Sequence, residues 1–190
     1  MNSRWKISTL LILFSFLFVS CQRSITVGPA DKALLVQASD LVPYGYGFQN
    51  IAKHETFKKS RDFDGTVEIE YEFETPDSEV EHSLYLDVVV TVSRATSDAR
   101  ISRGAEKLGL LGGLKLEGIV QEEKPGFYKY GDSSDFFVLK KDGTPVGNYF
   151  SVRDGKKTYS ILLAGMYIED ATVWKDLVEA KLKAMSVYKP

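Results

Sequence analysis

Four glutamates at a spacing of two residues are the densest group of chemically active side chains in this sequence. They alternate with apolar residues and are Glu68, Glu70, Glu72 and Glu74. Carboxylate oxygens are the ligands that hard cations such as calcium prefer, so one hypothesis is a cation-binding face. Side chains on one strand face stand about 7 Å apart, however, which is too far for all four to meet one ion. We therefore favour a solvated strand face whose charges also protect a sheet edge.

The two histidines, His54 and His82, are the next candidates for acid–base or metal chemistry. A hydrolytic dyad needs a nucleophile beside one of them, and a zinc site needs further ligands. The sequence contains no His-x-x-x-His pair and no Gly-x-Ser-x-Gly motif. We interpret both as surface histidines and predict no catalytic, metal or cofactor-binding residues.

A cluster of glycines could indicate a phosphate-binding loop; its members are Gly104, Gly109, Gly112 and Gly113. The Gly-Lys-Ser/Thr ending of such loops is missing, and an expected helix precedes the glycines instead of following them. The pattern predicts that Gly112-Gly113 ends a helix.

Cys21 is the only cysteine, which excludes disulfides within the chain, CxxC redox motifs and cysteine-based zinc sites. It follows Arg4 and Lys6 and an apolar run over residues 10–19. That run is too short to cross a membrane as a helix but has the length of a cleaved secretion signal. We expect residues 1–20 to be a signal peptide, residues 21–30 a tether, and residues 31–190 a single domain.

The segment Leu17-Phe18-Val19-Ser20-Cys21 resembles the bacterial lipobox, in which a small residue precedes an invariant cysteine. The resemblance implies that Cys21 carries diacylglycerol through a thioether and becomes the acylated N-terminus of a lipoprotein. Three acyl chains hold a protein on a bilayer essentially permanently, whereas one chain binds marginally. Gln22, in place of an Asp, implies the outer membrane facing the periplasm in a diderm bacterium.

The charge balance limits the partners of the chain that follows this signal. Both charged signal residues are basic, so the rest has 22 Lys and Arg against 26 Asp and Glu, a net charge of −4. Nucleic-acid binding needs a basic face that neutralises phosphates, so we exclude it. The expected partners are the membrane, through the lipid, and a protein in the envelope.

Alternating apolar residues predict strands over residues 66–75 and 84–92. Two Asp-Gly pairs then separate apolar runs and predict type I′ hairpin turns: Asp142-Gly143 and Asp154-Gly155. They join three consecutive antiparallel strands into a C-terminal meander. Arg153 beside the second turn is expected to pair locally with Asp132 or Asp135, or to meet an acidic partner.

Helices are predicted in three places by apolar spacing and caps. The first runs from Asp31 to about Ser39, and the last from Asp170 to about Met185 with Trp174 on its apolar face. The middle helix begins at Asp98, and its expected apolar stripe is Ile101, Ala105, Leu108 and Leu111. The fold class is therefore α+β, an antiparallel sheet of about five to seven strands covered by two or three helices.

Three aromatic residues between glycines, Tyr44, Tyr46 and Phe48, form the candidate interaction surface. Aromatic side chains recur at ligand pockets and docking surfaces, but the same residues can simply pack the open end of the sheet. Both interpretations stay open at the level of sequence.

The last fifty residues resemble the PsbP-like family. The resemblance rests on the strand 147–153, the Asp154-Gly155 turn, the strand 158–165, and the helix that carries Trp174. It implies an antiparallel sheet between helices, and binding or scaffolding in place of catalysis. We expect a non-enzymatic, membrane-anchored accessory module; the alternative is a carrier of a small ligand or lipid in a pocket between sheet and helices.

The lipid at Cys21 can be tested directly. Cys21→Ala removes the thiol that accepts the diacylglycerol, so the precursor should escape the lipoprotein peptidase and leave the detergent phase on phase separation. Metabolic labelling with an alkyne fatty acid measures the same loss. Equal partitioning of the variant and the natural chain would rule the anchor out.

Overall fold

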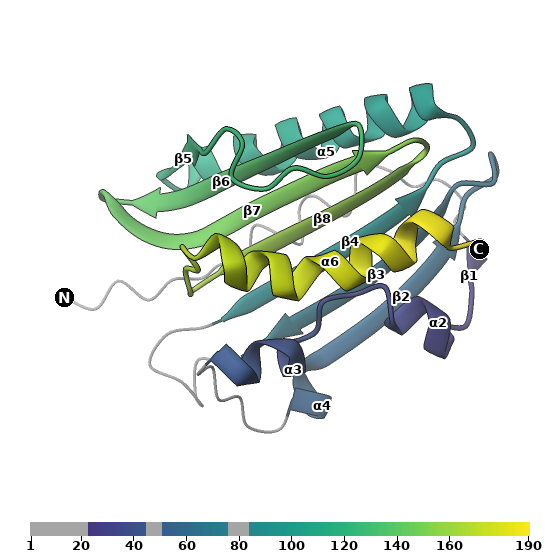
Figure 1. Ribbon diagram of the computed structural model, residues 1–190, viewed down its shortest axis with the longest axis horizontal. Helices are drawn as coiled ribbons and strands as arrows, with labels where there is room; N and C mark the ends of the chain where they lie inside the picture. Colours follow the sequence, from purple (N-terminus) through teal and green to yellow (C-terminus); the bar gives the residue numbers. More distant parts are fainter. Residues whose placement is uncertain (1–22, 45–50, 76–83) are drawn as a thin grey trace.

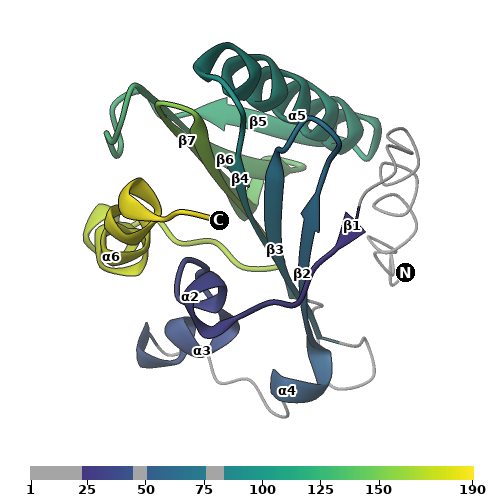
Figure 2. The same ribbon diagram turned by 90° about the vertical axis from the view of Figure 1, so that its right-hand side faces the viewer.

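The computed structural model describes residues 23–44, 51–75 and 84–190. These residues form an α+β domain in which one antiparallel sheet lies between two layers of helices (Figures 1 and 2). The predicted fold class is confirmed at this level. Within the described residues the sheet has eight strands, more than the predicted five to seven, and five α-helices accompany it.

The strands follow the order β1-β2-β3-β4-β8-β7-β6-β5 across the sheet. Their bounds are β1 (Arg23–Ser24), β2 (Glu55–Arg61), β3 (Val67–Glu74), β4 (Tyr85–Val92), β5 (Ile119–Glu123), β6 (Ser133–Lys141), β7 (Thr144–Asp154) and β8 (Lys157–Ala164). The α-helices are α2 (Pro29–Lys32), α3 (Ala38–Leu41), α4 (Ile51–His54), α5 (Thr96–Leu116) and α6 (Ala171–Val187), with a 3-10 turn, η1 (Val42–Tyr44). Part of the expected tether is thus folded, because β1 and the start of α2 lie within residues 23–30.

The main core lies between the sheet and the layer formed by α2, α3 and α6 (Figure 2). Each strand sends alternate side chains to this side, and on β3 these are Val67, Ile69, Tyr71 and Phe73, all fully buried. β4 and β8 contribute in the same way. The two strands predicted at 66–75 and 84–92 are confirmed, and they pair with each other in the centre of the sheet.

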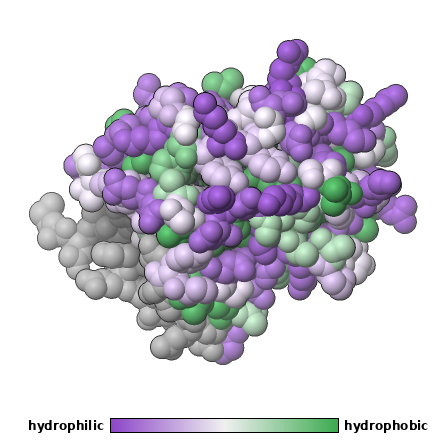
Figure 3. Space-filling view, viewed as in Figure 1, coloured by the Kyte–Doolittle hydropathy of each residue, from purple (hydrophilic) through white to green (hydrophobic). Residues whose placement is uncertain are grey.

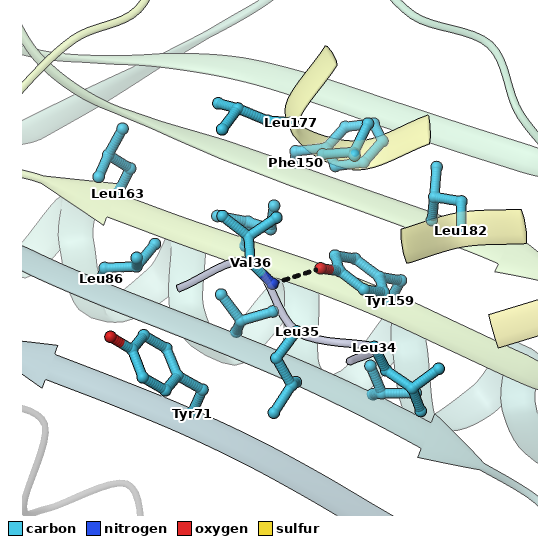
Figure 4. Close-up of a cluster of buried hydrophobic side chains, with 14 of the residues drawn as sticks. Leu34, Leu35, Val36, Tyr71, Leu86, Phe150, Tyr159, Leu163, Leu177 and Leu182 are labelled. Atoms are coloured by element: carbon cyan, nitrogen blue, oxygen red, sulfur yellow. Dashed lines mark hydrogen bonds between the residues drawn. The ribbon is translucent and has the colours of Figure 1, made fainter. Parts of the chain in front are cut away.

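The helix predicted from Asp31 to Ser39 is broken in the middle. Leu34, Leu35 and Val36 are consecutive and all buried, which one face of a helix cannot achieve. Backbone amides of this segment donate hydrogen bonds to tyrosine hydroxyls of the sheet, in place of the carbonyl oxygens that would accept them in a helix. The Val36 amide donates to Tyr159 Oη at 3.1 Å (Figure 4), and the amide of residue 38 donates to Tyr71 Oη at 3.0 Å.

The C-terminal meander is confirmed, with β6, β7 and β8 paired antiparallel in sequence order. At the first turn Asp142 has φ 50° and Gly143 has φ 80°, as a type I′ turn requires. The second turn differs from the prediction. Asp154 pairs with Lys157, so the central residues are Gly155 and Lys156, and only Gly155 has positive φ, at 59°. That pattern belongs to a type II′ turn.

The middle helix, α5, is longer than predicted, and only part of its predicted apolar stripe faces the sheet. It continues through Gly112 and Gly113 and ends at Leu116. Ile101 is 68% exposed and Leu108 76%, so this part of the stripe faces outward. Leu111 is half-buried and packs, with Leu110 and Leu114, against a second apolar cluster on the α5 side of the sheet.

The last helix, α6, matches its prediction. The Asp170 carboxylate caps its first turn by accepting a hydrogen bond from the Thr172 amide at 2.7 Å. Trp174 is 2% exposed, packs on Phe136 and Phe150, and donates its indole N–H to the Ile168 carbonyl at 3.0 Å. Trp174 is therefore a core residue.

Trp174→Ala should lower the free energy of unfolding by about 3–5 kcal/mol, since truncating a buried Trp leaves a large cavity. Urea denaturation followed by circular dichroism measures it. Val187→Ala is the matched control on the same helix, because Val187 is 76% exposed and should change stability by less than about 0.5 kcal/mol. Equal effects of the two substitutions would contradict the core assignment.

Candidate functional site

The face of the sheet opposite the main core carries most of the polar side chains of the strands. Alternation directs Glu68, Glu70 and Glu72 of β3 to this side, because their neighbours fill the core. α5 packs over the β5, β7 and β8 part of this face, while the β1–β3 part has no described helix over it (Figure 2). The candidate site lies where the covered and uncovered parts meet.

Arg103 of α5 holds the helix on the covered part of the face. Its guanidinium contacts Asp135 at 2.7 Å, donates to Ser151 Oγ at 2.8 Å and donates to Ser133 Oγ at 3.1 Å. Lys107 adds a second ion pair to Asp135 at 3.1 Å. A largely buried guanidinium satisfied by several acceptors fixes the position of the helix, so we assign this cluster a structural role.

A hollow of about 270 Å³ opens on the uncovered part of the face. Its lining residues are Ser24, Lys58, Lys59, Ser60, Glu68 and Glu70. The ammonium group of Lys58 contacts Glu70 and Glu72, each at 3.1 Å. Burial alone would lower the pKa of Lys58, but the two glutamates raise it above its ordinary value, so this lysine stays charged.

Two further carboxyl groups, on β4 and α5, interact electrostatically with the glutamates that line the hollow. Asp87 lies directly opposite Glu72 in the register of β3 and β4, on the same face. Its Oδ1 atom is buried and has no hydrogen-bond partner among the described residues. Glu106 reaches down from α5 and accepts a hydrogen bond from Ser160 Oγ at 2.5 Å. An unpaired buried polar atom costs stability, so Asp87 is a group that a bound partner could satisfy.

Burial and mutual repulsion raise the pKa values of these acids. Burial, with contributions from Glu70 and Glu106, raises the pKa of Glu68 from 4.5 to about 7. Burial also raises the pKa of Asp87 well above its ordinary value. Burial raises the pKa of Glu106, which its contacts with Ser160 and Arg103 offset only in part. Burial therefore favours the protonated forms of Glu68, Asp87 and Glu106.

The cluster combines several carboxyl groups with the ammonium group of Lys58. Within the described residues no group of His, Cys, Asp and Glu side chains is arranged to hold a metal ion. An ammonium or guanidinium group is larger than a metal ion and can bridge carboxylates that stand farther apart.

The sequence identified only part of this site. The glutamates were expected to form a solvated face, but Glu68, Glu70, Glu72 and Glu74 are all half-buried. Asp87 and Glu106 were not predicted as site residues. Asp87 sits in an otherwise apolar strand, and that misplaced charge is a signal that could have indicated it.

The other predicted residues are dispersed. Cys21, Tyr46, Phe48 and His82 lie outside the described residues. Tyr44 is half-buried and packs against the main core. His54 ends α4. Arg153 pairs with Asp132 at 2.6 Å, which confirms the local partner expected at the second turn.

Exposed apolar side chains differ between the two sides of the molecule. On the side that carries α6 it is mostly hydrophilic, with small scattered hydrophobic areas (Figure 3). α5 exposes Ile101, Leu108 and Leu116 on its outer face. In the part of the chain that the structure describes, no helix is long and apolar enough to cross a membrane.

No protein-family model, curated protein or solved structure matches this chain. Its function therefore has to be argued from its own residues, and the acidic hollow is the feature with the most specific chemistry.

The raised pKa of Glu68 predicts a stability that falls as pH rises. The folded state holds the proton up to about pH 7, whereas the unfolded chain releases it near 4.5, so folding is favoured below this window and penalised above it. Glu68→Gln should leave stability at pH 5 nearly unchanged and raise it at pH 8 by about 1–3 kcal/mol.

Urea denaturation of both proteins at the two pH values provides the measurement. Glu123→Gln is the control, because Glu123 is exposed on β5. If Glu68→Gln and Glu123→Gln shift stability alike at pH 8, Glu68 does not titrate as a buried acid.

Proposed function

We propose that this protein is a bacterial lipoprotein, anchored in the cell envelope by lipid on Cys21. The support is the lipobox-like segment at residues 17–21 and the absence of any other cysteine. Gln22 favours the outer membrane, with the domain facing the periplasm. The anchored domain is an accessory module that binds a partner and does no chemistry on it.

The binding site in this proposal is the acidic hollow, and its ligand is a Lys or Arg side chain of a protein partner. The observation that carries it is the buried Asp87 Oδ1, which has no partner among the described residues. Asp87 interacts electrostatically with Glu70, which lines the hollow together with Glu68. A bound cation would lower the pKa values of Glu68 and Asp87. Both groups would then release their protons, and their carboxylates would pair with the cation. Such charge-assisted hydrogen bonds are about twice as strong as neutral ones.

Two other functions have less support. A lipid or small-ligand carrier needs an apolar pocket between sheet and helices, but buried side chains from the strands, α2, α3 and α6 pack together there. General acid–base catalysis is favoured by one observation, the pKa of about 7 at Glu68. We place it second, because Glu106 and Arg103 are held by contacts that fix α5.

We also propose that the domain is PsbP-like. The support is the antiparallel sheet between helix layers and the two hairpins that precede the helix with Trp174. Fold likeness says little about activity, so the binding proposal rests on the hollow alone.

The ligand class can be tested with a fluorescent tetralysine peptide and the mature chain. We expect saturable binding that strengthens between pH 6 and 8 as Glu68 ionises. Glu70→Gln should weaken it at least tenfold, which corresponds to about 1.4 kcal/mol for one lost charge-assisted contact. Fluorescence anisotropy at fixed ionic strength measures the affinity.

The matched control is Asp176→Asn, which removes an exposed charge of α6 on the other side of the sheet. It should leave the affinity within twofold. Equal weakening by Glu70→Gln and Asp176→Asn would mean that the peptide responds only to net charge. The hollow would then not be the binding site.

A further inference from the structure

We propose that the hairpin tip between β2 and β3 lies in the membrane surface, with Phe63 as its apolar contact and the arginines beside it on lipid phosphates. This inference rests on the lipid anchor proposed above. It adds a second membrane contact, made by the folded domain, and thereby an orientation of the domain on the bilayer.

The first argument is the length of chain between the anchor and the sheet. Arg23 is already in β1, paired with Arg61 of β2, and only Gln22 separates it from Cys21. Two residues span at most about 7 Å, so the lipid holds this end of the sheet against the bilayer. Adding about 5.5 Å across the strand pair and about 7 Å along the chain places Phe63 within about 20 Å of Cys21.

The second argument is the exposure of Phe63. It is 84% exposed in the turn between β2 and β3, although an aromatic side chain of this size normally contributes to a core. The turn is well defined without it. The Gly65 amide donates to the Asp62 carbonyl at 3.0 Å, and the Thr66 amide donates to Asp64 Oδ1 at 2.8 Å. No contact of the turn requires an apolar residue at this position.

The third argument is the charge at this end of the sheet. Arg23 and Arg61 are directly opposite in the β1–β2 register, and both are exposed. Arg94 follows β4, next to the same turn, and attracts Asp64. The acidic groups at the tip are Asp62 and Asp64, so three arginines face two aspartates in a chain whose net charge is negative. Guanidinium groups pair well with lipid phosphates.

This orientation also keeps the hollow accessible. The hollow is lined by residues of β1, β2 and β3, whereas Phe63 lies in the turn between β2 and β3. A membrane at the hairpin tip leaves the acidic face open to a partner, while a membrane along α5 would bring that acidic face toward the lipid phosphates.

The test uses the natural lipidated protein in vesicles of about 3:1 phosphatidylcholine to phosphatidylglycerol, with or without brominated acyl chains that quench nearby indoles. Phe63→Trp should lose roughly half its added emission in brominated vesicles, because the indole sits at the interface. Leu108→Trp places the probe on the outer face of α5 and should not be quenched. The natural protein reports on the buried Trp174 and supplies the background.

The outcomes separate the two proposals. A lipidated chain that does not co-sediment with vesicles overturns the anchor, and the membrane contact with it. A chain that co-sediments but shows no quenching of Phe63→Trp keeps the anchor and overturns the hairpin contact. Quenching of Leu108→Trp in place of Phe63→Trp also overturns it, because α5 would then face the lipid.

Discussion

The strict alternation of side chains along the strands is the constraint on which the rest of this structure depends. A strand can send every second residue to one face only. Tyr71 and Phe73 of β3 and their neighbours on β4 and β8 close the main core against α6. Whatever stands between them must go to the other face, and on β3 those residues are glutamates. The acidic hollow is therefore a direct consequence of how the core is built.

The second face in turn determines how α5 packs. Arg103 and Glu106 turn inward because they bond to serines of this face, and Leu111 and its neighbours on α5 pack on a second apolar cluster beside those serines. Ile101 and Leu108 are left outside. The helix covers only the β5, β7 and β8 part of the face. Carboxyl groups at its margin are thus buried, and burial raises the pKa of Asp87 and of Glu106.

Local signals in the sequence predicted the elements that depend on local physics. The alternation in residues 66–75, the Asp142-Gly143 turn and the Asp170 cap each appear as expected. The prediction of one helix at 31–39 was wrong because tyrosine hydroxyls from strands far along the chain accept hydrogen bonds from its backbone amides. The predicted orientation of α5 was wrong in part, because it depends on the chemistry of a sheet face that periodicity alone cannot reveal. The site was found only in part for the same reason, since Glu106 joins Glu68 through that packing.

The proposed anchor and the proposed site are related because few residues separate Cys21 from the folded sheet. Had residues 23–30 formed a free tether, the domain could turn in any direction on the membrane, and no surface of it would be set apart. Because Arg23 pairs with β2 and Asp31 contacts Lys59 and Tyr188, the start of the chain is fixed to the sheet and to the end of α6. The lipid proposed at Cys21 would then hold a rigid body close to the bilayer. Under this proposal the direction in which the acidic face points would be a property of the fold, as a module that binds a partner beside the membrane requires.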